Sequence, residues 1–454
     1  MFRGPTVPDE TMTRMGSPSA PAVASAPEAI AALAEARERT LALVSPVSDG
    51  DLERVHSTLM SPLVWDLGHI AAFEDLWLVH RFGKLPMLRP DLVDVYDAVE
   101  TPRAKRGDLP FLPTTEARDY LARVRARTLE LIDERGVGDG VLHELVLRHE
   151  QQHNETMLQT LQLARLSDWM SPAEQAAPPA LQSTPTGLEL IDVPAGECTI
   201  GAHAAVEPAE PAWTAFAYDN ERPRHHAGVR AFQIGRVPIT NATYLTFVEG
   251  GGYRRREWWS DEGWSWKEQY DITRPGAWTA DHSSEWRLGT LEPLHPDRPV
   301  VHVSWFEADA FARSHGVRLP TEVEWEKAAT WDQQASSARA YPWGNDPPVA
   351  GVHANVDQLA CGTASAGAYP AGASPYGCLG MIGDTWEWTA SEFAGYAGFT
   401  AYPYREYSEP FFGGGYKVLR GGSWATRARI ATPTFRNWDH PQRRQIFSGI
   451  RVAQ

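Results

Sequence analysis

Apolar residues recur every three or four positions from Pro27 to about Leu166, a spacing that predicts amphipathic helices. The predicted second helix is interrupted at Ser61-Pro62, because proline favours a first helical turn. The helices are expected over residues 28–45, 51–82, 115–135 and 140–166. Four helices with polar connections predict a four-helix bundle, whose interior is a common place for a metal site. The proline-rich loop 83–114 is long enough to be functional.

A different pattern begins after residue 187, with short β-like runs, many glycines and many aromatic residues. We expect strands over 188–193, 232–237, 300–303 and 417–419, and helices over 238–249, 306–314 and 321–330. This mixture predicts an α+β domain with much irregular backbone. Residues 168–187 are rich in proline and alanine and predict a linker, and residues 1–26 predict a flexible tail. The sequence therefore predicts a helical domain over 27–167 and an α+β domain over 188–454.

The composition agrees with two globular domains and limits the classes of partner that the protein could bind. Hydrophobic residues make up 43% and charged residues 22% of the 454 positions. All tryptophans except Trp65, Trp77 and Trp169 lie after residue 200, which supports two domains of different kind. The net charge of −16 argues against nucleic acid or an anionic membrane as the main partner. Three cysteines form no disulfide framework, no run of 18 apolar residues occurs, and we expect a protein of the reducing cytoplasm.

Histidines on the helical domain form the sharpest chemical motif. His149 and His153 are four residues apart on the last predicted helix, so both imidazoles can reach one cation. His69 lies on the apolar face of another helix of the same bundle and is a plausible third ligand. Three neutral imidazoles leave open positions on iron, copper or zinc for oxygen or a substrate. The ligands alone do not choose among these metals.

The same five residues also match the H-E-x-x-H pattern of zinc proteases, in which Glu150 would be the general base. That alternative needs a third ligand, yet the chain after His153 only continues the helix. His56, His80 and His143 have no partner at suitable spacing, and we interpret them as structural or surface residues.

Longer motifs carry a family resemblance. The second domain resembles the formylglycine-generating-enzyme (sulfatase-modifying factor) domain, a C-type-lectin-like fold, and the first resembles a DinB-like bundle. The blocks in the second domain are VPAGECTIGA (193–202), DNERPRHH (219–226), IGRVPITNATYLTFVEGGGY (234–253), RLPTEVEWEKAA (318–329), YPWGN (341–345), MIGDTWEWTASEF (381–393), VLRGGSW (418–424) and GIRVA (449–453).

Together with HEQQHNETM in the bundle and FRNWDHPQRRQIF near the end, the chain is similar to the iron sulfoxide synthases of ergothioneine biosynthesis. That resemblance implies an oxidoreductase that joins the sulfur of a thiol to the imidazole C2 of hercynine (Nα-trimethylhistidine) with non-haem Fe(II) and O2. The actinobacterial type uses γ-glutamylcysteine and the fungal type uses cysteine. The bundle would carry the iron ligands, and the second domain most substrate contacts.

The resemblance also implies roles for single residues. The iron ligands fall on His69, His149 and His153, and the catalytic tyrosine on Tyr404, with Tyr396 and Tyr402 as nearby alternatives. The implied thiol-substrate contacts are Arg103, Arg106, Asp439 and Arg443. The implied hercynine contacts are Gln152, Asn437 and Trp438, and Tyr407 is a further substrate-binding residue.

The chemistry of these residue types suits the substrates. The carboxylates of γ-glutamylcysteine call for arginine and its ammonium for aspartate, whereas a quaternary ammonium suits an aromatic face such as Trp438. Alternatives on the same scaffold are an ovothiol-type synthase, a selenium analogue, a formylglycine-generating enzyme and a non-enzymatic lectin-like module. A formylglycine-generating enzyme needs a late pair of reactive cysteines, and neither Cys361 nor Cys378 lies in the RGGSW–GIRVA region.

Overall fold

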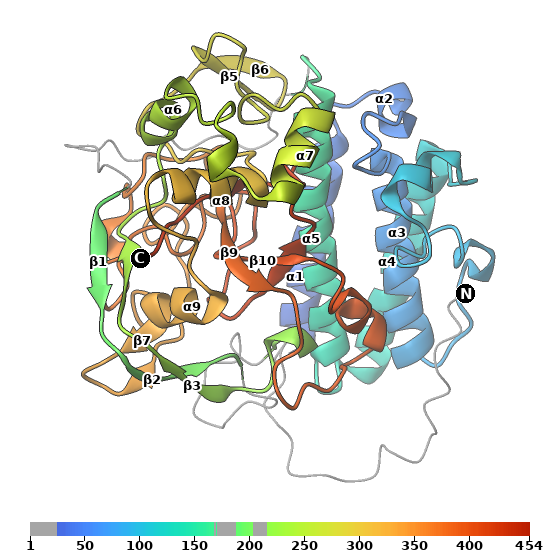
Figure 1. The fold of residues 1–454 in the computed structure, drawn as a ribbon. Coiled ribbons are helices and arrows are strands. Elements are labelled where there is room, and N and C mark those ends of the chain that lie inside the picture. The colour runs from blue at the N-terminus through green and yellow to red at the C-terminus, as the bar shows by residue number, and fades with distance from the viewer. Residues whose placement is uncertain (1–24, 168, 170–187, 203–215) are drawn as a thin grey trace. The chain divides into compact units, whose positions relative to one another are not determined.

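The computed structural model describes residues 25–167, 169, 188–202 and 216–454, which form two compact units (Figure 1). The first unit contains the described residues up to Trp169 together with Phe216, and the second contains the remainder. Most of the predicted tail and linker lies outside the described residues. Of the described residues in those two ranges, Ser25 caps the first helix, Ala26 begins it, and Trp169 is buried with its Nε1 donating to Leu43 O. None of the described helices combines the length and apolar character needed to cross a membrane.

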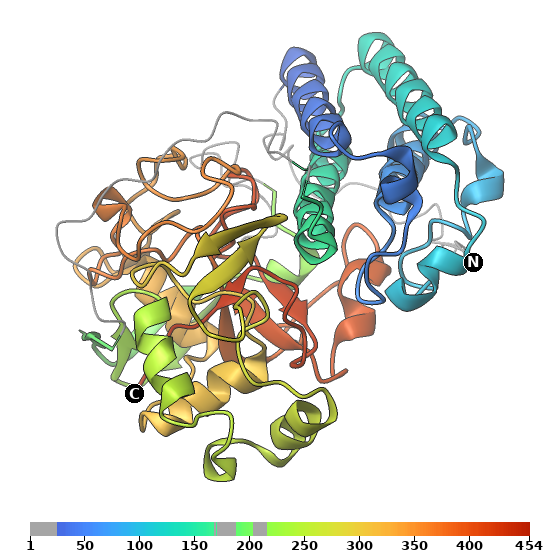
Figure 2. The same ribbon diagram turned by 90° about the horizontal axis from the view of Figure 1, so that it is seen from above.

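Four long helical segments form the first unit, as predicted (Figure 2). Helix α1 packs on α5, and α3 packs on both α4 and α5. The bounds are α1 (Ala26–Val44), α2 (Asp49–Glu53), α3 (Leu63–Glu74), the π-helical continuation η2 (Asp75–Phe82), the 3-10 turns η3 (Pro90–Leu92) and η4 (Arg103–Asp108), α4 (Thr114–Arg135) and α5 (Val141–Ala164). The predicted second helix is therefore two helices. The chain leaves the helix at Arg54 and resumes it after Pro62.

Four buried charges cross-link the helices of this unit. Arg37 of α1 donates to Glu74 at 2.8 Å and to Glu150 at 2.8 Å, and Arg125 of α4 donates to the same two carboxylates at 2.8 and 2.9 Å. Because each carboxylate meets two guanidinium groups, the charges are compensated inside an apolar core. The arginines lower the pKa of Glu74 to about 2, although burial opposes this.

The second unit is built on one four-stranded sheet and several small two-stranded ones. The main sheet has the order β11-β10-β9-β12, in which β12 pairs parallel with β9 and the other pairs are antiparallel. The strands are β1 (Leu190–Val193), β2 (Gly196–Ile200), β3 (His225–Val229), β4 (Phe232–Gly235), β5 (Ser284–Arg287), β6 (Thr290–Pro293), β7 (Trp331–Asp332), β8 (Ser337–Ala338), β9 (Trp386–Glu392), β10 (Lys417–Arg420), β11 (Asn437–Asp439) and β12 (Ser448–Gly449).

The helices of this unit are α6 (Asn241–Glu249), α7 (Asp261–Gln269), α8 (Trp305–Ser314) and α9 (Glu322–Thr330), and its 3-10 turns are η6 (Asp219–Glu221), η7 (Arg256–Trp258), η8 (Pro370–Gly372), η9 (Arg405–Tyr407) and η10 (Glu409–Phe411). Helices α6, α8 and α9 and strands β1, β4 and β10 correspond to predicted elements. The strand predicted over 300–303 is wrong. These residues are buried, but His302 has a φ of +59°, and the segment forms no ladder.

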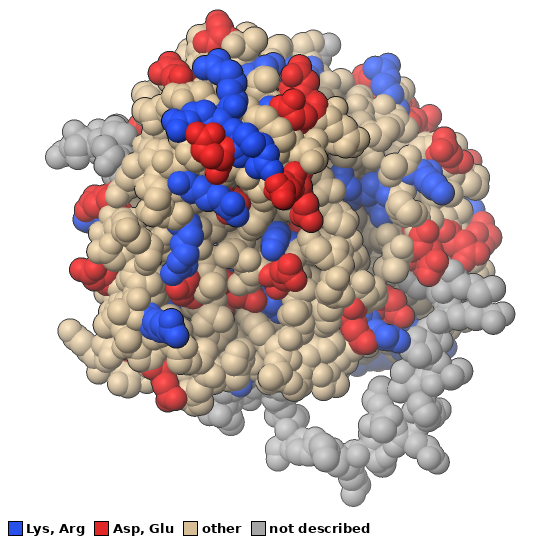
Figure 3. Space-filling view, in the orientation of Figure 1, with Lys and Arg blue, Asp and Glu red and all other residues tan. Residues whose placement is uncertain are grey.

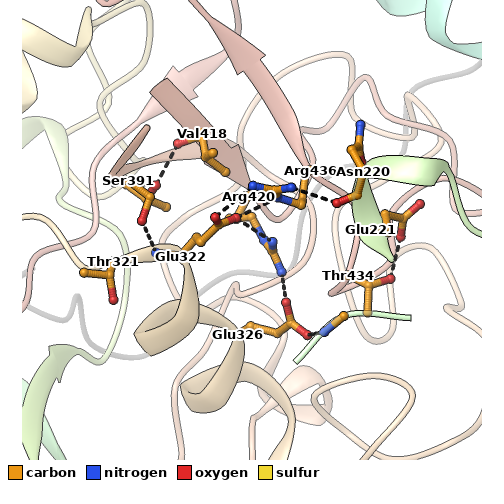
Figure 4. Close-up of polar contacts among 12 residues, drawn as sticks. Asn220, Glu221, Thr321, Glu322, Glu326, Ser391, Val418, Arg420, Thr434 and Arg436 are labelled. Carbon is orange, nitrogen blue, oxygen red and sulfur yellow. Dashed lines mark hydrogen bonds and ion pairs between the residues drawn. The ribbon is translucent and has the colours of Figure 1, made fainter. Parts of the chain in front are cut away.

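A second buried ionic network lies between α9 and the main sheet (Figure 4). Arg436 donates to both oxygens of Glu322 at 2.8 and 2.9 Å, and Arg420 pairs with Glu322 and Glu326. Arg436 directly precedes β11, so this network fixes the beginning of that strand. On the face drawn in Figure 3, acidic and basic side chains are interspersed rather than gathered by sign.

The charge network of the first unit should dominate its acid stability. The depressed pKa of Glu74 stabilises the fold above the unfolded value of about 4.5, and this stability is lost as the pH falls toward 2. Glu74→Gln should lower the free energy of unfolding at pH 7 by about 3 kcal/mol and flatten the acid dependence, measured by urea unfolding followed at 222 nm. Glu35→Gln removes an exposed ion pair with Arg39 and is the control, with an expected loss under about 1 kcal/mol. Equal losses in the two variants would contradict this account.

Candidate metal centre and substrate residues

The three predicted histidine ligands lie together inside the first unit. His69 projects from the middle of α3, and His149 and His153 project from successive turns of α5. Their ring centroids are 4.5–4.9 Å apart, and one nitrogen of each lies within 4.8 Å of the others. This is the group of possible metal ligands found among the described residues. The spare histidines lie elsewhere: His56 contacts Asp51 O, His80 contacts Leu85 O, and His143 packs on Phe82.

Hydrogen bonds orient two of the three rings. Nδ1 of His69 is 2.7 Å from the carbonyl of Tyr96, and Nδ1 of His153 is 2.9 Å from Oδ1 of Asp66. A carbonyl or carboxylate oxygen can only accept, so Nδ1 of each ring carries a proton, and Nε2 is the nitrogen of each ring that can bind a metal. Nε2 of His69 then faces Nε2 of His149 at 3.1 Å.

Burial and donor chemistry make this cluster suitable for a metal ion. Burial lowers the pKa of His69 well below 6.5, and His153 and Arg106 lower it further. Burial, followed by the neighbouring histidines, lowers the pKa of His149 in the same way. Both rings are therefore neutral at pH 7. Neutral imidazole nitrogens are common metal ligands, so the donor set fits a divalent transition metal.

Aromatic rings of α3 hold the ligand rings in place. Trp65 stacks on His69 with a centroid distance of 4.8 Å, and Phe73 stacks on His149 at 3.6 Å. A Cβ on Gly68 would lie 2.1 Å from the ring of Tyr96, so only glycine lets the chain that bears the Tyr96 carbonyl approach α3. Helical spacing places Asp66 and Phe73 on the same face of the helix as His69, but the sequence assigned no role to either residue, nor to Trp65 or Tyr96.

The position of Glu150 excludes the zinc-protease alternative. Its side chain is fully buried and accepts from Arg37, Arg125 and Thr40. A carboxylate engaged by two guanidinium groups cannot act as a general base at the metal. Within this H-E-x-x-H motif, the glutamate is thus a structural residue.

The loop 83–114 is held against the metal site. Asp75 accepts from the backbone of Leu88 and Arg89 at its beginning. Further along, Arg106 is buried with its guanidinium 3.9 Å from the centre of the Trp65 ring, and it donates to Thr101 O, Ala98 O and Ser61 Oγ. Burial, with Arg103 nearby, lowers the pKa of Arg106 to about 9.

Arg103 is half-buried one turn away, and its Nη1 donates weakly to Met60 Sδ at 3.7 Å. Gln152 is half-buried on α5 beside His153. Of the two predicted thiol-binding arginines, Arg106 therefore has its guanidinium engaged by three protein oxygens. The guanidinium of Arg103 makes only a weak contact with a thioether sulfur among the hydrogen bonds described here.

Three predicted substrate residues follow one another on β11 of the second unit. Asn437 and Trp438 pair with Leu419 and Val418, and Asp439 pairs with Lys417. Trp438 stacks on Phe393 at 4.2 Å and meets Tyr407 edge-on at 5.7 Å. Asp439 lies 3.6 Å from Arg443, whose Nη1 is buried with no hydrogen-bond partner among the described residues. A buried guanidinium nitrogen without a partner is a natural contact for a carboxylate ligand.

The tyrosines lie on the preceding loop. Tyr404 and Tyr407 are half-buried with ring centroids 6.1 Å apart, and burial raises the pKa of Tyr404 well above 10. Tyr404 is therefore a proton donor rather than a phenolate at pH 7. Tyr396 lies against Arg436 in the buried ionic network, and Tyr402 is exposed beside Arg222.

Removing one ligand should abolish metal binding without unfolding the bundle. His149→Ala should reduce bound Fe(II), measured by anaerobic titration and metal analysis, to background while the circular dichroism is retained. His143→Ala, on the same helix and more deeply buried, is the control and should load one equivalent. A metal-replete His149→Ala protein would contradict the ligand assignment.

Asp66 should contribute to metal affinity through His153. Asp66→Asn removes the anionic acceptor for Nδ1 and should weaken Fe(II) binding roughly 10- to 100-fold in a competition titration. An unchanged dissociation constant would show that the ring of His153 is oriented by packing alone.

Comparison with known proteins agrees with both units. Residues 175–454 match the model of the sulfatase-modifying factor enzyme 1-like domain, and residues 32–157 match the DinB superfamily. A formylglycine-generating enzyme of Mycobacterium tuberculosis is 30% identical over 45% of this chain and 74% of its own length.

Several relatives extend over nearly the whole chain, of which two are described here. The hercynine oxygenase of Mycolicibacterium smegmatis is 46% identical over 93% of this chain and 97% of its own length. That of Mycobacterium tuberculosis is 45% identical over 94% of this chain and 99% of its own length. With a DinB-like bundle and a sulfatase-modifying-factor domain joined in one polypeptide, the chain belongs to the hercynine oxygenase family and is an oxidoreductase.

Proposed function

We propose that this protein joins the sulfur of γ-glutamylcysteine to the imidazole C2 of hercynine and leaves the sulfur as a sulfoxide, in ergothioneine biosynthesis. In the balanced reaction, one C2–H, one S–H and one O2 give the carbon–sulfur bond, the sulfoxide oxygen and one water. The three imidazoles whose nitrogens meet inside the bundle carry this proposal, because as ligands they would leave positions on an iron ion open for reactants.

Fe(II) bound by His69, His149 and His153 would supply the redox chemistry with O2 and favour ionisation of the thiol. The Tyr96 carbonyl and Asp66 would orient the rings of His69 and His153 through their Nδ1 atoms, which leaves Nε2 of each ring for the metal. The buried position of His69 and Trp65 would exclude water from that side.

The charged residues would recognise the thiol substrate. Arg103 and Arg443 offer guanidinium groups to its two carboxylates, and Asp439 offers a carboxylate to its ammonium. Arg106 would act mainly by holding the loop that carries Arg103, because its guanidinium already donates to Thr101, Ala98 and Ser61. Asp439 and Arg443 lie 3.6 Å apart in an ion pair. This ion pair would open when the substrate ammonium binds Asp439 and a substrate carboxylate binds Arg443.

Hercynine would be bound by Trp438, Asn437, Gln152 and Tyr407. A quaternary ammonium donates no hydrogen bond and is attracted by the face of an aromatic ring. Trp438 is held rigidly for this purpose between Phe393 and Tyr407. The protonated hydroxyl of Tyr404 would donate a proton during sulfur oxidation and carbon–sulfur bond formation.

Cysteine chemistry of the formylglycine-generating type is not supported. All three cysteines are buried thiols, and burial raises the pKa of Cys198 to about 11 and also raises that of Cys378. Buried thiols of raised pKa are poor nucleophiles. These three cysteines form no disulfide, which supports the proposal that the protein works in the reducing cytoplasm.

The test is an aerobic incubation of Fe(II)-loaded protein with hercynine and either γ-glutamylcysteine or cysteine, followed by mass spectrometry. A hercynyl-γ-glutamylcysteine sulfoxide formed in large preference to the cysteine adduct supports the reaction and the thiol together. No adduct from iron-loaded protein overturns the proposal, and histidine or a selenosugar would then be the next substrate to assay.

Arg103 provides a sharper prediction for the thiol. Arg103→Leu should raise the KM for γ-glutamylcysteine about tenfold or more, while the KM for hercynine changes little, because one charge-assisted contact to a carboxylate is lost. Lys105→Leu, an exposed change in the same turn, is the control and should leave both constants unchanged. Equal increases in the two KM values of Arg103→Leu would remove Arg103 from the thiol site.

A further inference from the structure

One buried polar turn of the second unit is not accounted for by the reaction described above. Tyr218 caps the 3-10 turn η6, and Asp219, Asn220 and Glu221 are all 0–1% exposed. Burying three consecutive polar side chains is costly unless each is fully hydrogen-bonded. Their hydrogen bonds lead to the two segments that carry the predicted substrate and catalytic residues.

Toward the tyrosine loop, the contacts are made by Asp219. Its Oδ1 accepts from Ser408 Oγ at 2.5 Å, and its Oδ2 accepts from the backbone nitrogen of Tyr402 at 3.4 Å. Asn220 also donates to Ser408 Oγ at 3.1 Å. The carboxylate thus holds both ends of the segment 402–408, which contains Tyr404 and Tyr407.

Ring packing adds to these hydrogen bonds. Tyr218 stacks face to face on Tyr407, with centroids 4.3 Å apart and planes 11° apart. Tyr407 in turn meets Trp438 edge-on. Because Tyr218 is fixed by the turn, a shift of Asp219 would move the ring that Tyr407 packs against.

Toward β11, the contacts are made by Asn220 and Glu221 (Figure 4). Arg436 donates from Nη1 to Asn220 O at 2.7 Å while its other nitrogens bind Glu322, and Thr434 donates to Glu221 at 2.6 Å. Arg436 directly precedes Asn437, Trp438 and Asp439 in the sequence. The same turn therefore ties the tyrosine loop and the substrate strand to one buried framework.

We infer that Asp219 is a positioning residue for the reaction, which through Ser408 and the Tyr402 backbone sets where Tyr404 and Tyr407 lie relative to β11. This inference rests on the proposed function for its kinetic consequences. Asp219 is expected to make no contact with substrate. Its effect on catalysis would be exerted only through the geometry of the tyrosine loop.

The principal variant is Asp219→Asn, which keeps the size of the side chain. An amide presents one NH2 group where the carboxylate presents two acceptors, so either Ser408 or the Tyr402 N–H loses its acceptor. Ser408→Ala removes the partner hydroxyl and should give the same effect more weakly, since Tyr402 keeps its contact. Asp384→Asn is the matched control, because Asp384 is also a buried carboxylate of this unit but accepts from Asn355 and Ala364.

Kinetics provide the first readout. Asp219→Asn should lower kcat about tenfold and leave the KM for γ-glutamylcysteine and the iron content unchanged, because a misplaced proton donor slows the reaction rather than binding. It should also increase the share of O2 that oxidises the thiol alone (R–SH + O2 → R–SO2H). The inference is overturned if Asp219→Asn and Asp384→Asn lower Tm equally, lower kcat equally, and leave the ratio of products unchanged.

A second readout does not depend on the reaction. With 3-fluorotyrosine placed at position 407, the 19F NMR line should shift or broaden in Asp219→Asn and stay unchanged in Asp384→Asn. An unshifted line in Asp219→Asn overturns the positioning role even if the enzyme is active. Absence of any adduct from the wild-type protein overturns the proposed function instead, while the 19F result still decides the role of Asp219.

Discussion

Close approach of three imidazole rings from two helices is the constraint on which the account depends. Nε2 of His69 lies 3.1 Å from Nε2 of His149, in surroundings whose burial lowers the pKa of both rings. The Tyr96 carbonyl and the Asp66 carboxylate orient two of the three rings, and Trp65 and Phe73 stack on His69 and His149. These contacts keep one nitrogen of each ring within 4.8 Å of the others, which is an arrangement that fits a metal ion.

Both units use buried ion networks to fix the segments that surround functional residues. In the bundle, two arginines hold Glu74 and Glu150 and so lock α1, α4 and α5 around the metal ligands. In the second unit, Arg436 and Arg420 with Glu322 and Glu326 fix the beginning of β11. Networks of this kind contribute little to net stability compared with apolar packing, but they allow few alternative arrangements.

Much of the fold and the metal ligands could be predicted from local patterns. Helical periodicity and the i, i+4 spacing of His149 and His153 are local properties, so the bundle and two ligands follow from the sequence directly. His69 required the further assumption that two helices share one bundle. The break between α2 and α3 follows from Pro62, whereas the supposed strand at 300–303 failed because a buried apolar run looks the same with or without a partner strand.

Residues that act through distant contacts could not be found in this way. Tyr96 contributes a backbone carbonyl, which has no signature in the sequence. Glu150 is engaged by two arginines that lie 113 and 25 positions away in the sequence, so its structural role could not be foreseen from the motif. Asp219 and Ser408 are 189 positions apart. For the substrate residues on β11 and the tyrosine loop, the family resemblance indicated positions that spacing alone would not have singled out.

Stoichiometric reconstitution tests the central claim most directly. Metal-free protein is titrated with Fe(II) without O2, and the rate of sulfoxide formation from hercynine and γ-glutamylcysteine is then measured at each step. The account predicts a rate that rises linearly, saturates at one iron per chain and stays at background with Zn(II). Product formed by metal-free protein, or equal rates with zinc, would contradict it.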